Sequence, residues 1–264
     1  MIAVYLGYMR RSVQTQFQYR AANYFYMIGM VVEPVVYLVV WSTIARSNGG
    51  SVQGITPGQF AAYYIVWTLV RNMNIVLTPY AWEERIKDGT FSTQLLRPIH
   101  PIHEDLASFI GWKLVVIVLW IPIAAGLCVA FRPQLSPTVL QCVVFFLAIW
   151  GAYFIRAIMQ WALGLVSFWT TRVTAIFQAY YLSEMVLSGR LFPLRLLPDW
   201  LERLTWFFPF RWTFGFPITA LTGPISNREL FVGLGMQMAW IAISVALLKL
   251  VFPRAVRRFS SVGG

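Results

Sequence analysis

The chain has 264 residues, of which 58% are hydrophobic and 12% are charged. Soluble globular domains carry about 25% charged residues, so this composition excludes a large soluble catalytic domain and indicates a membrane protein. The formal net charge of +11 would suggest a nucleic-acid partner for a soluble chain. In a membrane chain it is typical of arginines that flank the spans, and we expect no nucleic-acid partner.

The amino-terminal segment 1–21 predicts a helix that lies in the membrane interface. Apolar side chains recur on one face of this helix and basic or amide side chains on the other, namely Leu6, Met9, Val13 and Phe17 against Arg10, Arg11, Gln14 and Gln18. The basic pair follows the first apolar residues instead of preceding them, which is not the pattern of a cleaved signal peptide.

Six apolar segments follow, and we expect each to cross the bilayer as a helix. They occupy residues 22–45, 58–80, 109–131, 138–168, 174–188 and 229–252. Capping signals precede three of them: Thr56, Pro57 and Gln59 for the second, Ser136 and Pro137 for the fourth, and Ser226 with Glu229 for the sixth, which Pro253 is expected to end. The sequence therefore predicts an all-α polytopic protein with six transmembrane helices in a single transmembrane domain, 1–264.

Six crossings place both termini on one side of the membrane, and the distribution of basic residues decides which side. The short segments on the side of the termini hold ten of them: Arg10, Arg11, Arg20, Arg85, Lys87, Arg97, Arg172, Arg254, Arg257 and Arg258. The short segments on the other side hold only Arg46 and Arg132. We therefore expect a multi-pass protein of the cell's inner or plasma membrane with both termini in the cytoplasm.

Charged side chains inside the apolar segments are candidate functional residues, because each costs about 2.5–3.5 kcal/mol at a helix centre. At 1.5 Å per residue, Glu33 and Arg71 stand roughly 16 Å and 14 Å from the inner ends of their spans. Arg156 and Glu184 stand roughly 18 Å and 15 Å from theirs. These depths predict two ion pairs, Glu33 with Arg71 and Arg156 with Glu184, which either fix the helix packing or line a substrate path.

The inner segment 81–108 begins with a dense charged stretch directly after the second span. We expect this stretch to continue the span as a helix that Gly89 ends, and its residues are Glu83, Glu84, Arg85, Ile86, Lys87, Asp88 and Gly89. Apolar Phe91, Leu95 and Leu96 follow. The composition fits two structures equally well: a short amphipathic element that docks into a groove of a cytoplasmic partner, and a solvated turn.

The segment 188–228 faces outward in this topology and combines five arginines with nine aromatic residues, unlike an ordinary hydrophilic loop. Asp199 and Glu202 have capping-box spacing and predict a short helix, and 210–222 predicts a second one bent at Pro217. The two helices fit a re-entrant hairpin in the outer leaflet or an interfacial lid. Contacts with an amphipathic or anionic lipid-like cargo are expected of Arg195, Trp200, Arg203 and Arg211.

Two smaller groups of residues have structural explanations. His100, His103, Glu104 and Asp105 have metal-ligand chemistry, but acids in the first turn of a helix also complement the helix dipole, and we expect no metal. Cys128 and Cys142 lie on either side of the turn between the third and fourth spans, where they either approach each other or, as we favour, stay buried and free.

Catalytic motifs are absent from the sequence. A phosphate-binding loop requires Gly-x-x-x-x-Gly-Lys followed by Ser or Thr, and none of the lysines, Lys87, Lys113 and Lys249, has that context. Ser-His-Asp, Cys-His and paired-carboxylate arrangements are likewise not recognisable. We therefore expect a chain that is not an enzyme and binds no ATP by itself.

This organisation resembles the membrane subunits of ATP-binding-cassette (ABC) transporters of the type-2 permease class, and the run 89–98 is similar to a subgroup signature of such permeases. The resemblance implies that 83–89, continued by 90–96, is the coupling helix that sits in a cleft of the nucleotide-binding subunit. It also implies two separate ATPase subunits, which bind the ATP and magnesium, and a second permease subunit, identical or different. This chain itself would carry no cofactor.

From the resemblance we expect the permease subunit of an ATP-driven exporter or flippase that contacts membrane lipids and moves a lipid-like or amphipathic cargo. The alternative is an ion-coupled secondary transporter in which Glu33, beside Pro34, is the proton site. A passive scaffold of a membrane complex is a third interpretation. The charged inner segment has no role in the second interpretation, and no repeat between the two halves of the chain supports it. The third interpretation predicts no transport at all.

Overall fold

The computed structural model describes the backbone of residues 1–170 and 173–258, and these residues form helices and connecting turns without a β-sheet. The α-helices are α1 (Ile2–Gln18), α2 (Arg20–Ser47), α3 (Pro57–Met73), α4 (Pro79–Lys87), α5 (Thr90–Leu95), α6 (Ile102–Phe131), α7 (Val139–Gly164), α8 (Val173–Leu187), α9 (Asp199–Thr205), α10 (Phe216–Thr222) and α11 (Asn227–Arg258). Three short helical turns of other types are η1 (Leu165–Phe168), η2 (Leu194–Leu196) and η3 (Arg211–Gly215). The predicted all-α class is confirmed.

Three helical segments of the described residues are long and apolar enough to cross a membrane: Ile102–Phe131, Val139–Phe168 and Asn227–Arg258. They correspond to the third, fourth and sixth expected spans. α2 has 28 residues, whereas α3 has 17 and α8 has 15, fewer than the about 20 that cross a bilayer as one helix. The six-span topology therefore stays a prediction.

α3 is the central helix of the molecule. Every residue from 60 to 70 is buried, and the helix packs against α2, α6, α7 and α10. A helix that is apolar on all its sides requires neighbours on all its sides, which explains this position. α1 packs along α6 and α11 packs along α7, so the remaining long helices are layered on the helices around α3.

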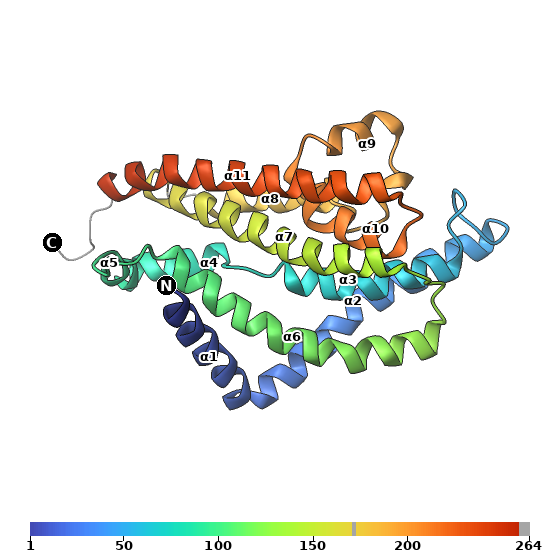
Figure 1. Cartoon of the computed structure of the whole chain (residues 1–264), viewed down its shortest axis with the longest axis horizontal. Coiled ribbons are helices and arrows are strands. Elements are labelled where there is room, and N and C mark those ends of the chain that lie inside the picture. The colour runs from blue at the N-terminus through green and yellow to red at the C-terminus, as the bar shows by residue number, and fades with distance from the viewer. Residues whose placement is uncertain (171–172, 259–264) are drawn as a thin grey trace.

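The long helices run between two ends of the molecule (Figure 1). One end gathers α4, α5, the start of α1 and the end of α11. The connections from α2 to α3 and from α6 to α7 lie at the other end. Both ends of the described chain thus lie on the side of α4 and α5, as an even number of crossings requires.

The expected continuation of the second span into the charged helix is wrong. α3 ends at Met73, residues 75–78 are not helical, and α4 begins at Pro79. Pro79 has no N–H, and it forces the preceding Thr78 into an extended conformation with φ −90° and ψ 160°. Thr78 then caps α4 by accepting a hydrogen bond from the Ala81 N–H at 3.3 Å. Gly89, with φ +68°, follows α4 and separates it from α5, so its role as a helix end is confirmed.

The capping predictions have mixed outcomes. The capping box of Thr56 with Gln59 is present, and so are the reciprocal hydrogen bonds between Ser226 and Glu229. α7, however, is capped by Thr138 and not by Ser136. The reason is spacing, because only Thr138 has a glutamine three residues later that can complete a capping box.

The expected end of the last span at Pro253 is also wrong. α11 continues through this proline to Arg258. A proline inside a helix removes one backbone hydrogen bond, which favourable packing beyond it can offset. Ala255 supplies such packing, since it is fully buried in the core between the helices.

The segment 188–228 forms two unlike halves. α9 starts at Asp199 as expected, but no side chain caps it, and it ends at Thr205. It protrudes from the bundle (Figure 1), with the Trp200 side chain 68% exposed. η3 and α10 are buried and pack against α3 and α7. Insertion of this hairpin into the outer leaflet stays a prediction.

Candidate functional site

Aromatic packing holds α4 and α5 to the helix bundle. Trp82 on α4 is fully buried, and its ring centroid lies 4.9 Å from that of Trp161 on α7 and 5.5 Å from that of Phe91 on α5. Gly164 on α7 leaves the space that the indole occupies, because a Cβ atom at this position would overlap the Trp82 ring. Trp82 therefore fixes the expected coupling segment to α7.

An ion pair ties α4 to the start of α6. The Arg85 guanidinium donates two hydrogen bonds to the Asp105 carboxylate, of 2.7 Å to Oδ2 and 2.5 Å to Oδ1. Asp105 Oδ2 also accepts a hydrogen bond of 2.8 Å from Trp161 Nε1. Burial by itself lowers the pKa of Arg85, but the hydrogen bonds and the charge of Asp105 outweigh it and raise the pKa above its usual value. The Asp105 carboxylate thus joins α4, α6 and α7.

The opposite side of α4 and α5 is exposed and charged. Its exposed side chains include Glu84, Lys87 and Asp88, with Leu96 beyond the end of α5 at 87% exposure. The other expected coupling residues are turned further toward the bundle: Phe91 is buried, and Glu83, Arg85, Ile86 and Gly89 are half-buried. The expected set therefore divides into residues that anchor the segment and residues available to a partner. Docking of a partner on this exposed face stays a prediction.

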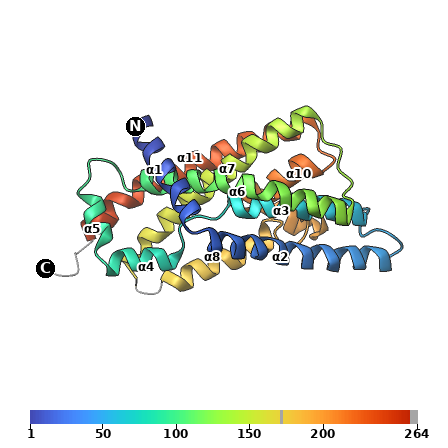
Figure 2. The same ribbon diagram turned by 90° about the horizontal axis from the view of Figure 1, so that it is seen from below.

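The start of α8 lies beside α4 (Figure 2). Glu83 Oε1 accepts a hydrogen bond of 3.0 Å from the Thr174 hydroxyl of α8, and Lys87 Nζ lies 3.9 Å from Glu83 Oε2. Glu83 therefore contributes to the attachment of α4. Arg172, one of the ten basic residues counted on the side of the termini, lies outside the described residues.

The predicted Glu33–Arg71 ion pair is confirmed. Arg71 Nη2 lies 2.9 Å from Glu33 Oε2, and the Tyr37 hydroxyl donates a hydrogen bond of 3.4 Å to Oε1. A second guanidinium, from Arg190 in the connection after α8, lies 3.4 Å from Oε1. The three charged side chains are 26–29% exposed, so the cluster is not sealed inside the chain.

The predicted Arg156–Glu184 ion pair is also confirmed, and it is much more deeply buried. The two side chains are 8% and 0% exposed, and they join α7 to α8. The Arg156 guanidinium carbon also lies 5.8 Å and 5.5 Å from the ring centroids of Tyr181 and Phe214. Glu184 Oε2 accepts no hydrogen bond from the described residues. A role of either ion pair in a substrate path stays a prediction.

Lys113 on α6 is a buried ionisable side chain that the sequence alone did not assign to a site. Its side chain is fully buried, and Nζ donates a hydrogen bond of 2.6 Å to the backbone carbonyl of Ile75. It also lies 4.4 Å from the ring centroid of Tyr153. Ile75 belongs to the non-helical stretch between α3 and α4, so Lys113 supplies a donor to a carbonyl that the helix break leaves unpaired. A lone lysine inside an otherwise apolar helix was the feature of the sequence that could have marked Lys113 as a candidate.

The outer hairpin covers a pocket of about 270 Å³ beside α3. Arg195 and Arg211, both expected to contact cargo, line this pocket together with Glu202 and Glu229. Arg211 Nη1 lies 3.4 Å from Glu202 Oε1, and its guanidinium carbon lies 4.5 Å from the Trp206 ring centroid. The positive side chains of this pocket are therefore accompanied by carboxylates.

The other two expected cargo residues lie elsewhere on the hairpin. Trp200 and Arg203 are exposed on α9 and are not among the residues that line the pocket. The structure therefore separates the four candidates into a pocket pair and an exposed pair. Their contacts with cargo stay a prediction.

The histidine-containing segment at the start of α6 consists of paired side chains. His103 Nδ1 lies 2.7 Å from the Tyr5 hydroxyl of α1, and Arg97 Nη1 lies 2.6 Å from Glu104 Oε2. Burial, together with the neighbouring His103, lowers the pKa of His100 to about 4. No cluster of three or more metal-ligating side chains occurs in the described part of the chain.

Cys128 and Cys142 lie near the other end of the molecule, on α6 and α7. Both thiols are free, and both side chains are exposed. The preference for free thiols is confirmed, but their expected burial is wrong. Each side chain lies on a helix face that no other described helix covers.

Comparison with known protein families identifies the chain. A family model described as ABC-2 family transporter protein matches residues 31–263, which leaves out only α1 and the first part of α2 among the described helices. A search of curated proteins finds no match. ABC-2 permeases are membrane subunits of transporters that associate with ABC ATPase subunits, and the long apolar helices agree with a membrane location. The chain therefore belongs to the ABC-2 family of transporter membrane proteins.

Proposed function

We propose that this chain is the permease subunit of an ATP-driven exporter or flippase and that separate subunits hydrolyse the ATP. The observation that carries the proposal is α4, which is fixed to the bundle on one side and presents an exposed charged face on the other. The proposed complex contains two ATPase subunits, which bind ATP and magnesium, and a second permease subunit, identical or different. α4, α5 and both termini face the cytoplasm of an inner or plasma membrane.

In this proposal α4 transmits the movement of the ATPase to α6 and α7. The ATPase contacts Glu84, Lys87 and Asp88, and the resulting force passes through the buried Trp82 and the half-buried Arg85. Arg85 transfers it to Asp105 at the start of α6, and Trp82 transfers it to α7. The non-helical residues 75–78 allow α4 to move without rotating α3 as one rigid rod.

The proposed cargo is amphipathic or anionic and lipid-like. Arg195 and Arg211 line the pocket beneath the outer hairpin, together with Tyr63 and apolar side chains such as Leu194 and Ile225. A phosphate or carboxylate head and an apolar body therefore both find suitable groups there. Export that is unaffected by Arg195→Gln and Arg211→Gln would remove the basis of this cargo assignment.

Co-purification tests the coupling proposal. The tagged chain is extracted from its own membranes in mild detergent, bound proteins are identified by mass spectrometry, and ATP hydrolysis is measured. We expect an ABC ATPase to be retained and its hydrolysis to be faster in the complex than alone. The double variant Lys87→Glu/Asp88→Lys should release the ATPase without lowering the melting temperature of the chain, because both side chains are exposed.

Arg228→Glu is the matched control for this experiment. Arg228 is also exposed, but it lies in the first turn of α11, near the opposite end of the molecule. The control should keep the ATPase bound. Full retention of the ATPase by the α4 double variant, or a chain that purifies without any ATPase, would contradict the proposal.

A further inference from the structure

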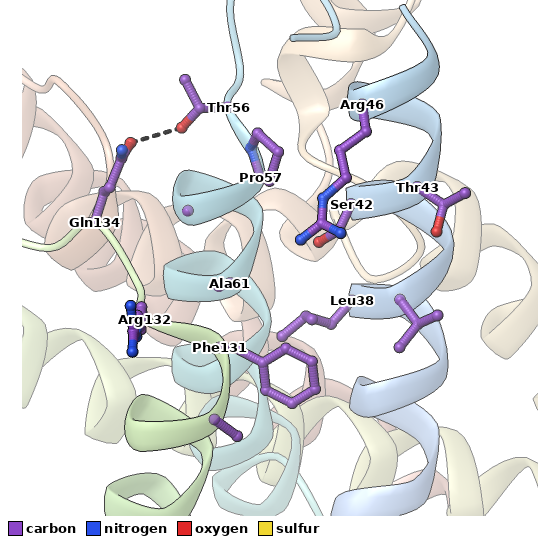
Figure 3. A pocket seen from close by; sticks show the side chains of 13 residues that line it. Leu38, Ser42, Thr43, Arg46, Thr56, Pro57, Ala61, Phe131, Arg132 and Gln134 are labelled. Atoms are coloured by element: carbon purple, nitrogen blue, oxygen red, sulfur yellow. Dashed lines mark hydrogen bonds between the residues drawn. The ribbon is translucent and has the colours of Figure 1, made fainter. Parts of the chain in front are cut away.

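A second pocket, of about 540 Å³, opens between the ends of α2, α3 and α6 (Figure 3). It lies at the end of the molecule opposite α4 and α5 (Figure 1). Its inner wall is apolar and includes Leu38, Ala61 and Phe131. Its rim is polar, with hydroxyl, amide and guanidinium groups from Ser42, Thr43, Arg46, Thr56, Arg132 and Gln134.

The rim carries two positive charges and no negative charge. Arg46 extends from α2 toward Pro57, and Arg132 lies on the other side of the pocket, just after α6 (Figure 3). Within the described residues, neither guanidinium takes part in an ion pair or a hydrogen bond, and no carboxylate lines the pocket. The pocket beneath the outer hairpin differs in this respect, because Glu202 and Glu229 also line it and Arg211 forms an ion pair with Glu202.

These two arginines are also exceptional in the sequence. Arg46 and Arg132 are the basic residues that the expected topology leaves in the short outward segments, where such residues are otherwise avoided. Residues that far apart in the chain need not lie close together, yet both line the same pocket. Two positive side chains that border one pocket from opposite sides, without a carboxylate, favour an anion inside it.

Gln134 adds a hydrogen-bond donor to the rim. The Thr56 hydroxyl donates a hydrogen bond of 2.6 Å to Gln134 Oε1 (Figure 3), and the Gln134 backbone N–H donates one of 2.9 Å to the Gly58 carbonyl. The first bond holds the side chain by its oxygen atom, and the second holds the backbone. Its NH₂ group makes no hydrogen bond with another described residue, so it can donate to a ligand.

The backbone at Arg132 points to function as well. This residue has φ +47° and ψ 63°, a left-handed conformation after the end of α6 that favours glycine. The chain keeps an arginine where glycine would suit the backbone better. Unfavourable backbone conformations of this kind are concentrated at binding sites.

We propose that this pocket binds the phosphate of an anionic amphiphile. The phosphate is attracted from two sides, by Arg46 on the α2 side of the pocket and by Arg132 with the Gln134 amide on the α6 side (Figure 3). A guanidinium group forms paired, charge-assisted hydrogen bonds with phosphate oxygens, and the second one adds attraction over a longer distance. The apolar wall takes the first part of the acyl chain, which continues along the exposed side chains of Val36, Val39 and Val40 on α2, 54%, 49% and 47% exposed. This site does not depend on the ATP-driven function proposed above.

Lipid retention tests the proposal directly. The intact protein, with any subunits that co-purify, is placed in nanodiscs of phosphatidylcholine containing phosphatidylglycerol, and the lipids retained on release are counted by native mass spectrometry. We expect preferential retention of phosphatidylglycerol. Arg46→Gln and Arg132→Gly should each weaken this retention about tenfold, the factor expected when one charge-assisted contact worth about 1.4 kcal/mol is lost.

Gln53→Gly is the matched control, because Gln53 is the other described non-glycine residue with positive φ, at +46°, and it does not line the pocket. Both glycine variants should melt at or above the temperature of the unaltered protein, since each relieves the same backbone strain. Only Arg132→Gly should lose lipid. Weaker retention therefore cannot be attributed to unfolding.

Inorganic phosphate, added to the lipid-free protein in detergent, distinguishes a lipid from a soluble anion. A melting temperature that rises with phosphatidylglycerol but not with inorganic phosphate supports the amphiphile. A rise with inorganic phosphate that Arg46→Gln abolishes supports the anion site but overturns the acyl-chain part of the proposal. Phosphatidylglycerol retention that is unchanged in both arginine variants would overturn the proposal as a whole.

Discussion

Arg156 and Glu184 bring two opposite charges into the interior of the helix bundle, where each is tolerated only because of the other. Their side chains are 8% and 0% exposed. Removing one partner from such a pair leaves an uncompensated buried charge and costs about 3–5 kcal/mol. We therefore predict that Arg156→Gln and Glu184→Gln each lower the melting temperature of the purified protein strongly. The exchange Arg156→Glu/Glu184→Arg should recover most of the loss.

The Glu33 cluster provides the comparison for this prediction. Glu33 has a second guanidinium partner, because Arg190 Nη2 lies 3.4 Å from its Oε1. Arg71→Gln therefore leaves no unpaired carboxylate and should lower the melting temperature far less. Transport then separates two roles of the buried pair. Recovery of transport in the charge exchange assigns the pair to helix packing, whereas stability without transport assigns it to the substrate path. A Glu184→Gln protein as stable as the unaltered one would contradict the buried-pair argument.

The ion pairs show what can be predicted about single residues from the sequence. Equal depth along two apolar helices was enough to pair Glu33 with Arg71 and Arg156 with Glu184, because a charge in a bilayer requires a partner at its own height. The contact of Arg190 with Glu33 was not predicted, because Arg190 lies in a connection between helices, where depth in the membrane cannot be counted along a helix. The partner of Lys113 was not predicted either, because it is the backbone carbonyl of Ile75, which is available only because α3 ends before this residue.

At the scale of elements, the attachment of α4 depends on a position without a side chain on α7. A Cβ atom at Gly164 would overlap the Trp82 ring, which is fully buried between Phe91 and Trp161 and cannot swing aside. We predict that Gly164→Ala displaces α4. The expected result is a loss of about 1–3 kcal/mol from overpacking, seen as a lower melting temperature, together with weaker stimulation of a bound ATPase.

Gly126→Ala on α6 is the control for this substitution. Gly126 also lies inside a long helix, but nothing approaches within 4 Å of a Cβ atom placed there. Alanine is a better helix former than glycine by about 1 kcal/mol, so this variant should melt at the same or a higher temperature. If both variants behaved alike, the packing of Trp82 against Gly164 would not be what holds α4.

The helices themselves were predictable where local signals act alone and less so where packing decides. Each of the six apolar segments contains a helix, although within the described residues only three of these are long and apolar enough to cross a membrane, and the Thr56 and Ser226 capping boxes marked two starts correctly. The ends were harder to predict. Pro79 interrupts the second segment because of its own stereochemistry, whereas Pro253 does not end α11, since the buried Ala255 packs the turn beyond it. A local rule cannot anticipate the second outcome, because the packing that decides it comes from residues distant in the chain.

At the scale of the molecule, its two ends carry different chemistry. The end with α4 and α5 presents a charged face of both signs, which we propose as the contact for the ATPase. The other end holds the anion pocket, with Arg46 and Arg132. If the bundle spans the membrane between these ends, nucleotide-driven movement enters at one face and lipid contacts form at the other. The orientation of the chain is therefore a central premise of both proposals.

Cysteine labelling tests this orientation. In a background with Cys128→Ser and Cys142→Ser, Ser136→Cys marks the connection between α6 and α7, and Thr93→Cys marks α5; both positions are exposed. A charged maleimide cannot cross the bilayer, so in right-side-out vesicles we expect it to label Ser136→Cys directly and Thr93→Cys only after permeabilisation. Ala148→Cys, at a fully buried position, controls for unspecific reaction. The reverse pattern would put α4 and α5 outside, beyond the reach of any cytoplasmic ATPase, and would contradict the coupling proposal.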